Sequence, residues 1–276
     1  MHVWWVMALL AAGPEVSVIP ARPVAGAFVT VVVRVEGRRS KVEGEMAGEP
    51  LHFEMAADST WRALGGVPVT AEDSVEIRLV TADGERADTS SHWIGLTAGD
   101  PPVERLSVDP RFSRPLSRAL QARVERELAS ARAVGRRAHA TPRLDDGGFT
   151  LPVESRVTSP YGVRREYNGE LRSRHLGADL AGPTGTPVRA PARGVVALVG
   201  RFYYAGNVVY LDHGRGLTTG YLHLSRVHVA VGDTVERGEV IGRIGATGRV
   251  TGPHLHWVAR YGVVPLDAMT LVSGER

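Results

Sequence analysis

The chain has 276 residues, more than the roughly 100 to 200 residues of most single domains, so we expect two domains joined by a connector. It contains no cysteine and a single lysine, Lys41, which excludes disulfides, thiolate metal ligands, cysteine nucleophiles and the phosphate-binding lysine of a Walker motif. A net charge of +3, without a sharp basic cluster, argues against a dedicated nucleic-acid-binding protein.

The first 13 residues, MHVWWVMALLAAG, form an apolar run followed by small side chains. This pattern resembles the hydrophobic region of a secretory signal peptide, although the basic segment that usually precedes it is missing. A short apolar run is also typical of a first β-strand, so both interpretations stay open. No segment reaches the ~18 consecutive apolar residues of a membrane span, and we therefore expect no stable membrane helix.

Residues 14–98 have an all-β pattern. Residues 26–35 are rich in β-branched side chains, and residues 74–80 alternate apolar with charged side chains before the turn at Asp83 and Gly84. The segment predicts a small β-sandwich of immunoglobulin type. Its two histidines, His52 and His92, are isolated, as is typical of ordinary strand residues rather than ligands.

A proline pair at 101–102 marks a connector over residues 99–149. Within it, apolar side chains recur every fourth residue at Leu116, Leu120, Val124 and Leu128. This spacing predicts one amphipathic helix over residues 115–134. Nine arginines lie between positions 111 and 143, and we interpret them as a solvated helix face rather than a polyanion-binding surface.

After residue 150, short apolar segments alternate with glycine turns, at residues 194–198, 207–212, 238–242 and 254–259. No helix-length periodic segment separates them, which favours an antiparallel sheet or folded barrel over repeated βαβ units. The sequence therefore predicts a mainly β protein whose second β domain covers residues 150–276.

Three motifs in this second domain contain candidate functional histidines. HLGAD at 175–179 offers His175 and Asp179, HLH at 254–256 offers His254 and His256, and YLHL at 221–224 adds His223. Two imidazoles and one carboxylate can hold a metal ion, with two imidazoles to spare, which is the inventory of a hydrolytic zinc site. Spacing alone leaves open whether His254 and His256 both bind the ion or whether one is catalytic.

The spacing of the first motif demands a bend in the chain. In an extended strand, His175 and Asp179 would lie ~13 Å apart, too far for one ion with bonds of about 2 Å. Gly177 lies between them and allows a turn or bulge. We therefore include this glycine in the argument for a shared metal ion.

The ordered motifs of this domain resemble those of the lysostaphin-type (LytM-like) zinc peptidases, which cut peptidoglycan peptides. The blocks are SPYGVR at 159–164, HLGAD at 175–179, GTPV at 185–188, GNVV at 206–209, YLHL at 221–224, VGDTVERG at 231–238 and TGRVTGPHLH at 247–256. The resemblance covers residues 159–271 and says nothing about the N-terminal domain. It implies a C-terminal peptidase domain of lysostaphin type, built on an antiparallel sheet or folded barrel.

The resemblance also implies residue roles. His175, Asp179 and His256 would bind Zn²⁺, and His223 and His254 would be the two metal-free catalytic imidazoles. A zinc ion with three protein ligands lowers the pKa of its bound water toward ~7 and polarises a carbonyl. One imidazole would then take the proton and the other would donate to the oxyanion or leaving amine, in an order that stays open.

Asn207 and Arg164 are further candidates, for binding the substrate. Asn207 follows Gly206, so a turn-forming asparagine is an equal interpretation. We interpret His213, in the DHG segment at 212–214, as a turn or supporting histidine rather than a ligand.

These observations predict an exported zinc metalloendopeptidase, placed in the periplasm or cell envelope, that hydrolyses peptide bonds in peptidoglycan stem peptides or cross-bridges. The alternative is a catalytically silent wall-binding or amidase-activating module, whose mark would be a missing ligand or catalytic histidine. A third hypothesis is a non-haem iron oxygenase, because two histidines and one carboxylate also bind iron. The sequence carries no signal for an oligomeric state.

Overall fold

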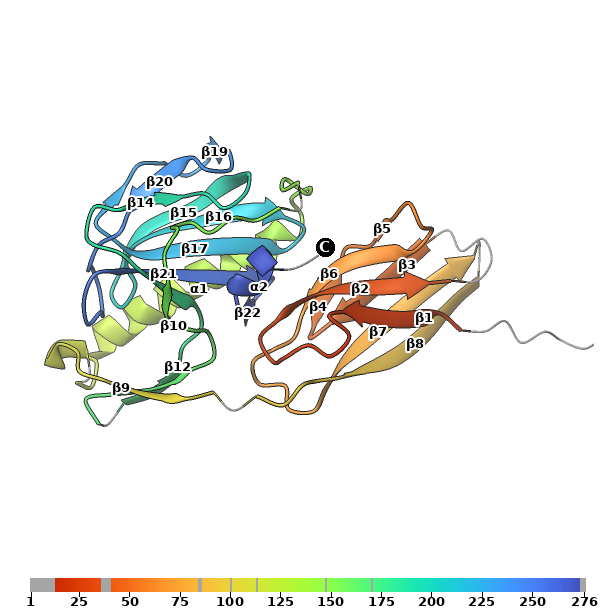
Figure 1. Ribbon diagram of the computed structural model, residues 1–276, viewed down its shortest axis with the longest axis horizontal. Helices are drawn as coiled ribbons and strands as arrows, with labels where there is room; N and C mark the ends of the chain where they lie inside the picture. Colours follow the sequence, from red (N-terminus) through yellow and green to blue (C-terminus); the bar gives the residue numbers. More distant parts are fainter. Residues whose placement is uncertain are drawn as a thin grey trace, which may run out of the picture.

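The computed structural model describes residues 13–35, 41–83, 86–99, 101–112, 114–146, 148–169 and 171–273. Within these ranges the chain forms an N-terminal β unit, a connector with one long helix, and a larger C-terminal β unit (Figure 1), so the predicted mainly β class is confirmed. The predicted signal segment, apart from Gly13, lies outside the described residues. None of the helices in these ranges has the length and apolar composition that crossing a bilayer requires.

The N-terminal unit contains two antiparallel four-stranded sheets (Figure 1). Their strands, in order across each sheet, are β1 (Glu15–Ile19), β2 (Phe28–Arg34), β6 (Trp61–Gly66) and β5 (Glu54–Met55), then β4 (Glu49–Leu51), β3 (Lys41–Met46), β7 (Ser74–Asp83) and β8 (Arg86–Gly95). On β7 the buried side chains Val75, Ile77 and Leu79 alternate with more exposed ones, as the period of two in the sequence predicts. They join Val31 of β2 in one apolar core between the sheets.

The connector contains β9 (Val103–Leu106), the short helix η1 (Pro110–Phe112) and helix α1 (Arg118–Ala138). Helix α1 begins three residues later and ends four residues later than the predicted span of 115–134. It begins after Ser117, whose hydroxyl accepts a hydrogen bond from the backbone N–H of Leu120 and so satisfies one free donor of the first turn.

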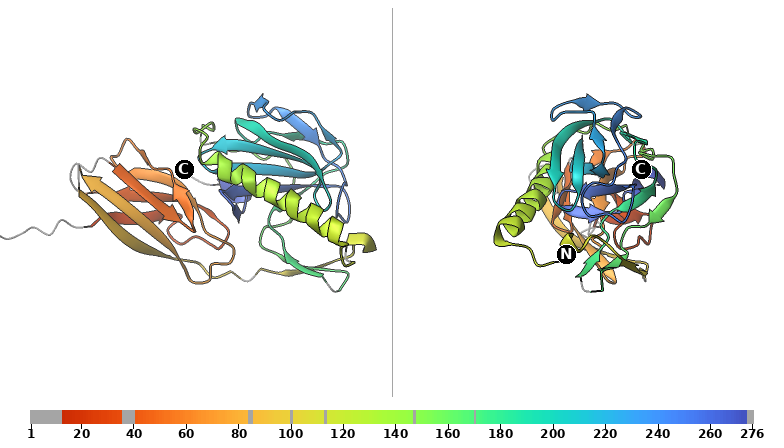
Figure 2. Two further views of the ribbon diagram at one scale, coloured as in Figure 1. Left: turned by 180° about the vertical axis from the view of Figure 1, so that it is seen from behind. Right: turned by 90° about the vertical axis from the view of Figure 1, so that its left-hand side faces the viewer.

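The buried face of α1 also differs from the predicted stripe. Leu128 is 49% exposed, whereas the fully buried positions are Ala131, Val134, Gly135 and Ala138 near the C-terminal end. Small residues occupy the buried positions because the helix lies very close to the neighbouring β-sheet (Figure 2). A Cβ at Gly135, for example, would collide with the carbonyl oxygen of Gly262.

The C-terminal unit is built around an antiparallel eight-stranded sheet. Its strands, in spatial order, are β10 (Val157–Ser159), β13 (Ala178–Ala181), β21 (His254–Tyr261), β17 (Leu217–Leu224), β16 (Gly206–Gly214), β15 (Gly194–Phe202) and β19 (Thr234–Val235), with β22 (Val264–Leu266) paired to β21. One small sheet contains β14 (Pro187–Arg189), β20 (Val240–Arg243) and β18 (Arg226–Val227). Another contains β12 (Leu171–Arg174), β11 (Arg164–Tyr167) and the connector strand β9, which pairs in parallel with β11.

The two β units pack against each other through the last elements of the chain, β22 and α2 (Met269–Ser273). Leu266 of β22 lies so close to Gly66 of β6 that a side chain at Gly66 would displace it. The backbone N–H of Phe28 donates to Thr270 Oγ1 across the same junction, at 3.1 Å. The two units therefore share apolar and polar contacts, and they lie end to end in the elongated molecule (Figures 1 and 2).

Glu49 makes a buried polar contact across the junction of the two units. Its side chain is 9% exposed, Oε1 accepts a hydrogen bond from Val263 N at 2.8 Å, and Oε2 lies 2.9 Å from Nε2 of His139. Nδ1 of His139 in turn lies 2.9 Å from Nε2 of His52. One carboxylate of the N-terminal unit therefore satisfies a donor of the C-terminal unit and a donor of the connector.

We expect Glu49→Ala to lower the free energy of unfolding by about 1 to 3 kcal/mol, because the buried Val263 N–H and the His139 ring lose their acceptor. Differential scanning calorimetry would show this as a lower melting temperature. Glu43→Ala is the control, since Glu43 is exposed on β3 and pairs only with Lys41 among the described residues. Equal melting temperatures for the two variants would contradict the prediction.

Candidate metal centre and groove

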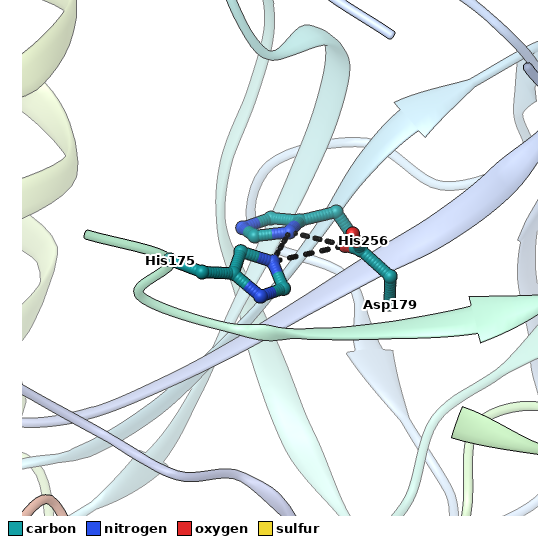
Figure 3. Close-up of side chains that lie close together, drawn as sticks. All are labelled: His175, Asp179 and His256. Carbon is teal, nitrogen blue, oxygen red and sulfur yellow. Dashed lines mark hydrogen bonds and ion pairs between the residues drawn. The ribbon is translucent and has the colours of Figure 1, made fainter. Parts of the chain in front are cut away.

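Three side chains converge on one point in the C-terminal unit (Figure 3). His175 Nε2 lies 3.1 Å from Asp179 Oδ1 and 2.9 Å from His256 Nδ1, and His256 Nδ1 lies 2.7 Å from Asp179 Oδ1. Within the described residues this is the only group of three histidine or acidic side chains close enough to share an ion. The distance test that the sequence motifs posed is therefore met.

Strand pairing brings two of these side chains together. In the antiparallel pair β13 and β21, Asp179 lies directly opposite His256. Residues directly opposite in such a pair have Cβ atoms about 4.5–5.5 Å apart, so the two side chains meet on one face of the sheet. His175 arrives from the loop before β13, where its backbone pairs with Val163 and Gly162.

Gly177 has a different role from the one that the sequence suggested. The chain does bend between His175 and β13, but Gly177 is not among the glycines with positive φ. Instead, a Cβ at Gly177 would lie 2.7 Å from Cε1 of His256 and 2.7 Å from the carbonyl oxygen of Trp257. The missing side chain is needed for space, because the loop packs directly on a candidate ligand.

The donor set fits a metal ion. Nδ1 of His175 lies 2.8 Å from the carbonyl oxygen of Pro160, so it donates there and leaves the Nε2 lone pair directed at the other two atoms. In a tetrahedral zinc site with bonds of about 2.0–2.1 Å, ligand atoms lie about 3.3 Å apart. The observed separations are slightly shorter, so small outward shifts of the side chains would make room for an ion.

The charge states also suit metal binding. Burial would raise the pKa of Asp179, but the hydrogen bonds and charges of His175 and His256 outweigh it and hold this pKa well below its usual value. Burial lowers the pKa of His256 to about 4, against the opposing effect of Asp179. At neutral pH the centre therefore offers an ionised carboxylate beside a neutral His256, the forms in which both groups bind a metal.

Arg165 holds the second oxygen of the candidate carboxylate ligand. Its Nη2 lies 2.5 Å from Asp179 Oδ2, which leaves Oδ1 directed at the two histidines. Nη2 also donates to Ser159 Oγ, and Nε donates to Glu104 Oε2 at 3.1 Å. Glu104 belongs to β9, so the connector takes part in positioning Asp179.

His223 and His254 lie beside the three convergent side chains. Their ring centroids are 5.0 Å apart, and Nε2 of His254 lies 3.6 Å from Asp179 Oδ1. Each ring has its Nδ1 against a backbone carbonyl oxygen, of Thr247 for His223 and of Gly252 for His254. Each Nδ1 therefore donates a hydrogen bond, which leaves Nε2 as the nitrogen of each ring that is available for acid–base chemistry.

The backbone of His223 is unusual. Its φ is 64°, in the left-handed region that non-glycine residues seldom adopt, and it lies where the register between β16 and β17 shifts. Burial, followed by the neighbouring His256 and His254, lowers the pKa of His223 to about 3, so its ring is neutral at neutral pH. Strained backbone of this kind gathers at functional sites, where the surrounding structure holds it in place.

The histidines open onto a groove of about 390 Å³, lined among others by Glu104, Arg165, Tyr167, His223, Arg249 and His254. Sequence motifs did not identify Glu104, because it lies in the connector, outside the motif-bearing domain.

Another hollow, of about 430 Å³, lies at the junction of the two β units and contains none of the seven predicted site residues.

The two predicted substrate-binding residues do not line this groove. Arg164 precedes Arg165 on β11 and therefore points to the opposite face of that strand, where it is exposed. Asn207 donates from Nδ2 to the carbonyl oxygen of Leu224, which ties β16 to the end of β17. His213 is fully buried between Arg193 O and Thr219 Oγ1, in agreement with a supporting role.

Comparison with known proteins identifies the family. Residues 173–268 match the family described as Peptidase family M23. The catalytic domain of lysostaphin from Staphylococcus simulans is 32% identical, over 44% of this chain and 93% of that domain, with a TM-score of 0.40. The chain belongs to the M23 peptidase family. The lysostaphin-type resemblance predicted from the motifs is thereby confirmed.

Two further proteins are similar to this chain, one in sequence and one in overall fold. The peptidoglycan DD-endopeptidase ShyA of Vibrio cholerae is 45% identical over 121 residues, which is 43% of this chain and 28% of that protein. A crystal structure of a Pseudomonas aeruginosa protein described as a peptidase M23 has a TM-score of 0.71 and 29% identity, and the match covers 91% of this chain and 95% of that one. The chain thus spans less than a third of the curated relatives, but shares nearly its whole fold with the solved protein.

We expect Gly177→Ala to weaken Zn²⁺ binding roughly 10- to 100-fold, because the added methyl group pushes the His256 ring out of line with His175 and Asp179. Competition with a chromogenic chelator measures the dissociation constant. Gly95→Ala is the matched control, since a Cβ at Gly95 meets no atom within 4 Å. An unchanged zinc affinity in Gly177→Ala would show that the close contact does not position His256.

Proposed function

We propose that the protein is a zinc-dependent endopeptidase that hydrolyses peptide bonds in peptidoglycan stem peptides or cross-bridges. The observation that supports this most strongly is the convergence of His175, Asp179 and His256 beside two further histidines on the wall of a groove. Membership of the M23 peptidase family and the named activity of the Vibrio cholerae relative support the same reaction.

In this proposal His175, Asp179 and His256 hold the zinc ion. The ion would supply Lewis-acid polarisation of the scissile carbonyl and would lower the pKa of a water molecule. Asp179 would bind through Oδ1 alone, since Arg165 holds Oδ2. The hydrogen bond from His175 Nδ1 to Pro160 O keeps the ligand nitrogen of that ring directed at the centre.

His223 and His254 are the proposed acid–base pair. Because Nδ1 of each ring donates to a carbonyl oxygen, Nε2 is the nitrogen that can exchange a proton, and either ring can take the role of accepting one from the attacking water. The other can then donate to the oxyanion or to the leaving amine. The two ring centroids lie 5.0 Å apart, and the order of their roles stays open.

We also propose the domain organisation that the sequence predicted. It comprises an immunoglobulin-type β-sandwich over residues 14–98, a connector over residues 99–149 and a peptidase domain of lysostaphin type over residues 150–276. Export to the periplasm or cell envelope follows from the proposed substrate, which lies outside the cytoplasm. Arg164 and Asn207 stay predictions as substrate contacts. Because neither lines the groove, we propose the groove-lining residues as the main substrate contacts.

The role assignment predicts two classes of variant. His175→Ala should lose the zinc ion, because one of three ligands is missing. His223→Ala and His254→Ala should keep about one zinc per chain but lower kcat at least 100-fold, since general acid–base catalysis typically contributes 10²- to 10⁴-fold. Elemental analysis and peptide cleavage rates measure the two effects.

The matched control is His228→Ala, whose histidine is exposed and lies away from the groove lining. It should keep both the metal and the activity. Stoichiometric loss of zinc from His223→Ala would overturn the division between ligands and catalysts, and iron in place of zinc in the purified protein would favour the oxygenase alternative.

Digestion of purified sacculi tests the reaction itself. We expect the protein to release peptide-cleaved fragments, to stop doing so after treatment with a chelator, and to resume when zinc is restored. Mass spectrometry of the fragments identifies the bond. Binding to sacculi without chelator-sensitive cleavage would favour the silent wall-binding module instead.

A further inference from the structure

The groove holds an arginine that no role above uses. The guanidinium carbon of Arg249 lies 4.1 Å from the ring centroid of Tyr167 and 4.5 Å from that of Tyr204. Its backbone N–H donates to the carbonyl oxygen of Tyr204 at 2.8 Å. Arg249 is half-buried and lines the same groove as His223 and His254, so it faces the path that a substrate would take.

The two rings that contact the guanidinium of Arg249 are themselves held in place. Tyr167 is buried at the end of β11, and Tyr204 lies in the turn between β15 and β16. Both belong to an apolar cluster with Phe112 and Val108 of the connector, and Phe112 also packs against Tyr203. The Arg249 side chain is therefore already held in place by these rings, and it loses little conformational entropy when a ligand binds.

The charge of Arg249 is not neutralised by a neighbouring carboxylate in the described part of the chain. The acidic side chains that line the groove, Asp179 and Glu104, are both paired with Arg165. Arg156 also lines the groove but is exposed and has no aromatic platform. Among the groove residues that the structure describes, Arg249 is thus the cationic side chain that is held by aromatic rings and has no carboxylate partner.

Stacking covers the face of a guanidinium and leaves its N–H groups in the plane, where they match the two oxygens of a carboxylate. From this geometry we infer that Arg249 binds a substrate carboxylate next to the scissile bond. The inference rests on the proposed function and narrows the substrate class to peptides that carry a free carboxylate beside the bond that is cut. Neutral peptides, such as glycine bridges or amidated forms, would lack this contact.

Two synthetic peptides test the assignment, identical except for a carboxylate or a carboxamide beside the scissile bond. For the unmodified protein we expect kcat/KM to be roughly 10- to 100-fold higher for the acid, the range for a hydrogen-bonded charged pair. Arg249→Ala should cut the acid and the amide at nearly equal rates. Arg249→Lys should keep only part of the preference, because an ammonium group cannot form the bidentate contact.

Arg156→Ala and Arg226→Ala are the controls, one for the other unpaired arginine of the groove and one for an exposed arginine on β18. Both should retain the preference for the acid. Loss of the preference in Arg156→Ala but not in Arg249→Ala would overturn the assignment. Equal cleavage of acid and amide by the unmodified protein would also overturn it while leaving the endopeptidase proposal intact.

Calorimetric binding of the same two peptides provides a readout that does not depend on cleavage. The acid should bind at least tenfold more tightly than the amide to the unmodified protein and equally to Arg249→Ala. Equal binding in the unmodified protein would refute the carboxylate site even if neither peptide were cut. Failure to cut either peptide or sacculi, with the binding difference preserved, would count against the endopeptidase proposal alone.

Discussion

The register between β13 and β21 is the constraint on which the candidate metal centre depends. Asp179 and His256 meet because they lie directly opposite each other, and a slip of one residue would turn one of them to the other face of the sheet. The neighbours on the opposite face, Leu180, Leu255 and Trp257, are fully buried in the main apolar core. The packing of these apolar side chains therefore fixes the positions of two candidate ligands, and core and site cannot vary independently.

The connector contributes to the groove as well as joining two β units. Strand β9 extends the sheet of β11 and places Glu104 against Arg165, which holds Asp179. Further along, Phe112 joins the cluster beneath the groove wall. Both contacts come from residues outside the segment that matches the M23 family, so the shape of the groove depends on how the chain enters the peptidase domain.

The sequence predicted the features that local motifs determine, such as the candidate ligands. It did not predict the features that depend on how helices and strands pack together. The motifs offered His175, Asp179, His254 and His256 as candidate ligands, and the family resemblance selected His256 over His254, in agreement with the group that converges in the structure. The prediction of which α1 side chains are buried was wrong. Hydrophobicity favours leucine at buried positions, whereas close contact between this helix and the sheet requires small residues. Arg165 was not distinguished from Arg164, because the pairing of β11 with β9 decides which face of the strand looks into the groove.

His223 shows how a residue with strained backbone is held in place in the groove wall. A left-handed backbone costs a non-glycine residue roughly 1–2 kcal/mol, so other contacts must offset that cost. Thr247 O accepts from the ring, and Thr247 Oγ1 and Asn207 Nδ2 both bond to the carbonyl oxygen of Leu224, the next residue. Asn207 therefore acts on the groove indirectly, by fixing the end of the strand that positions His223.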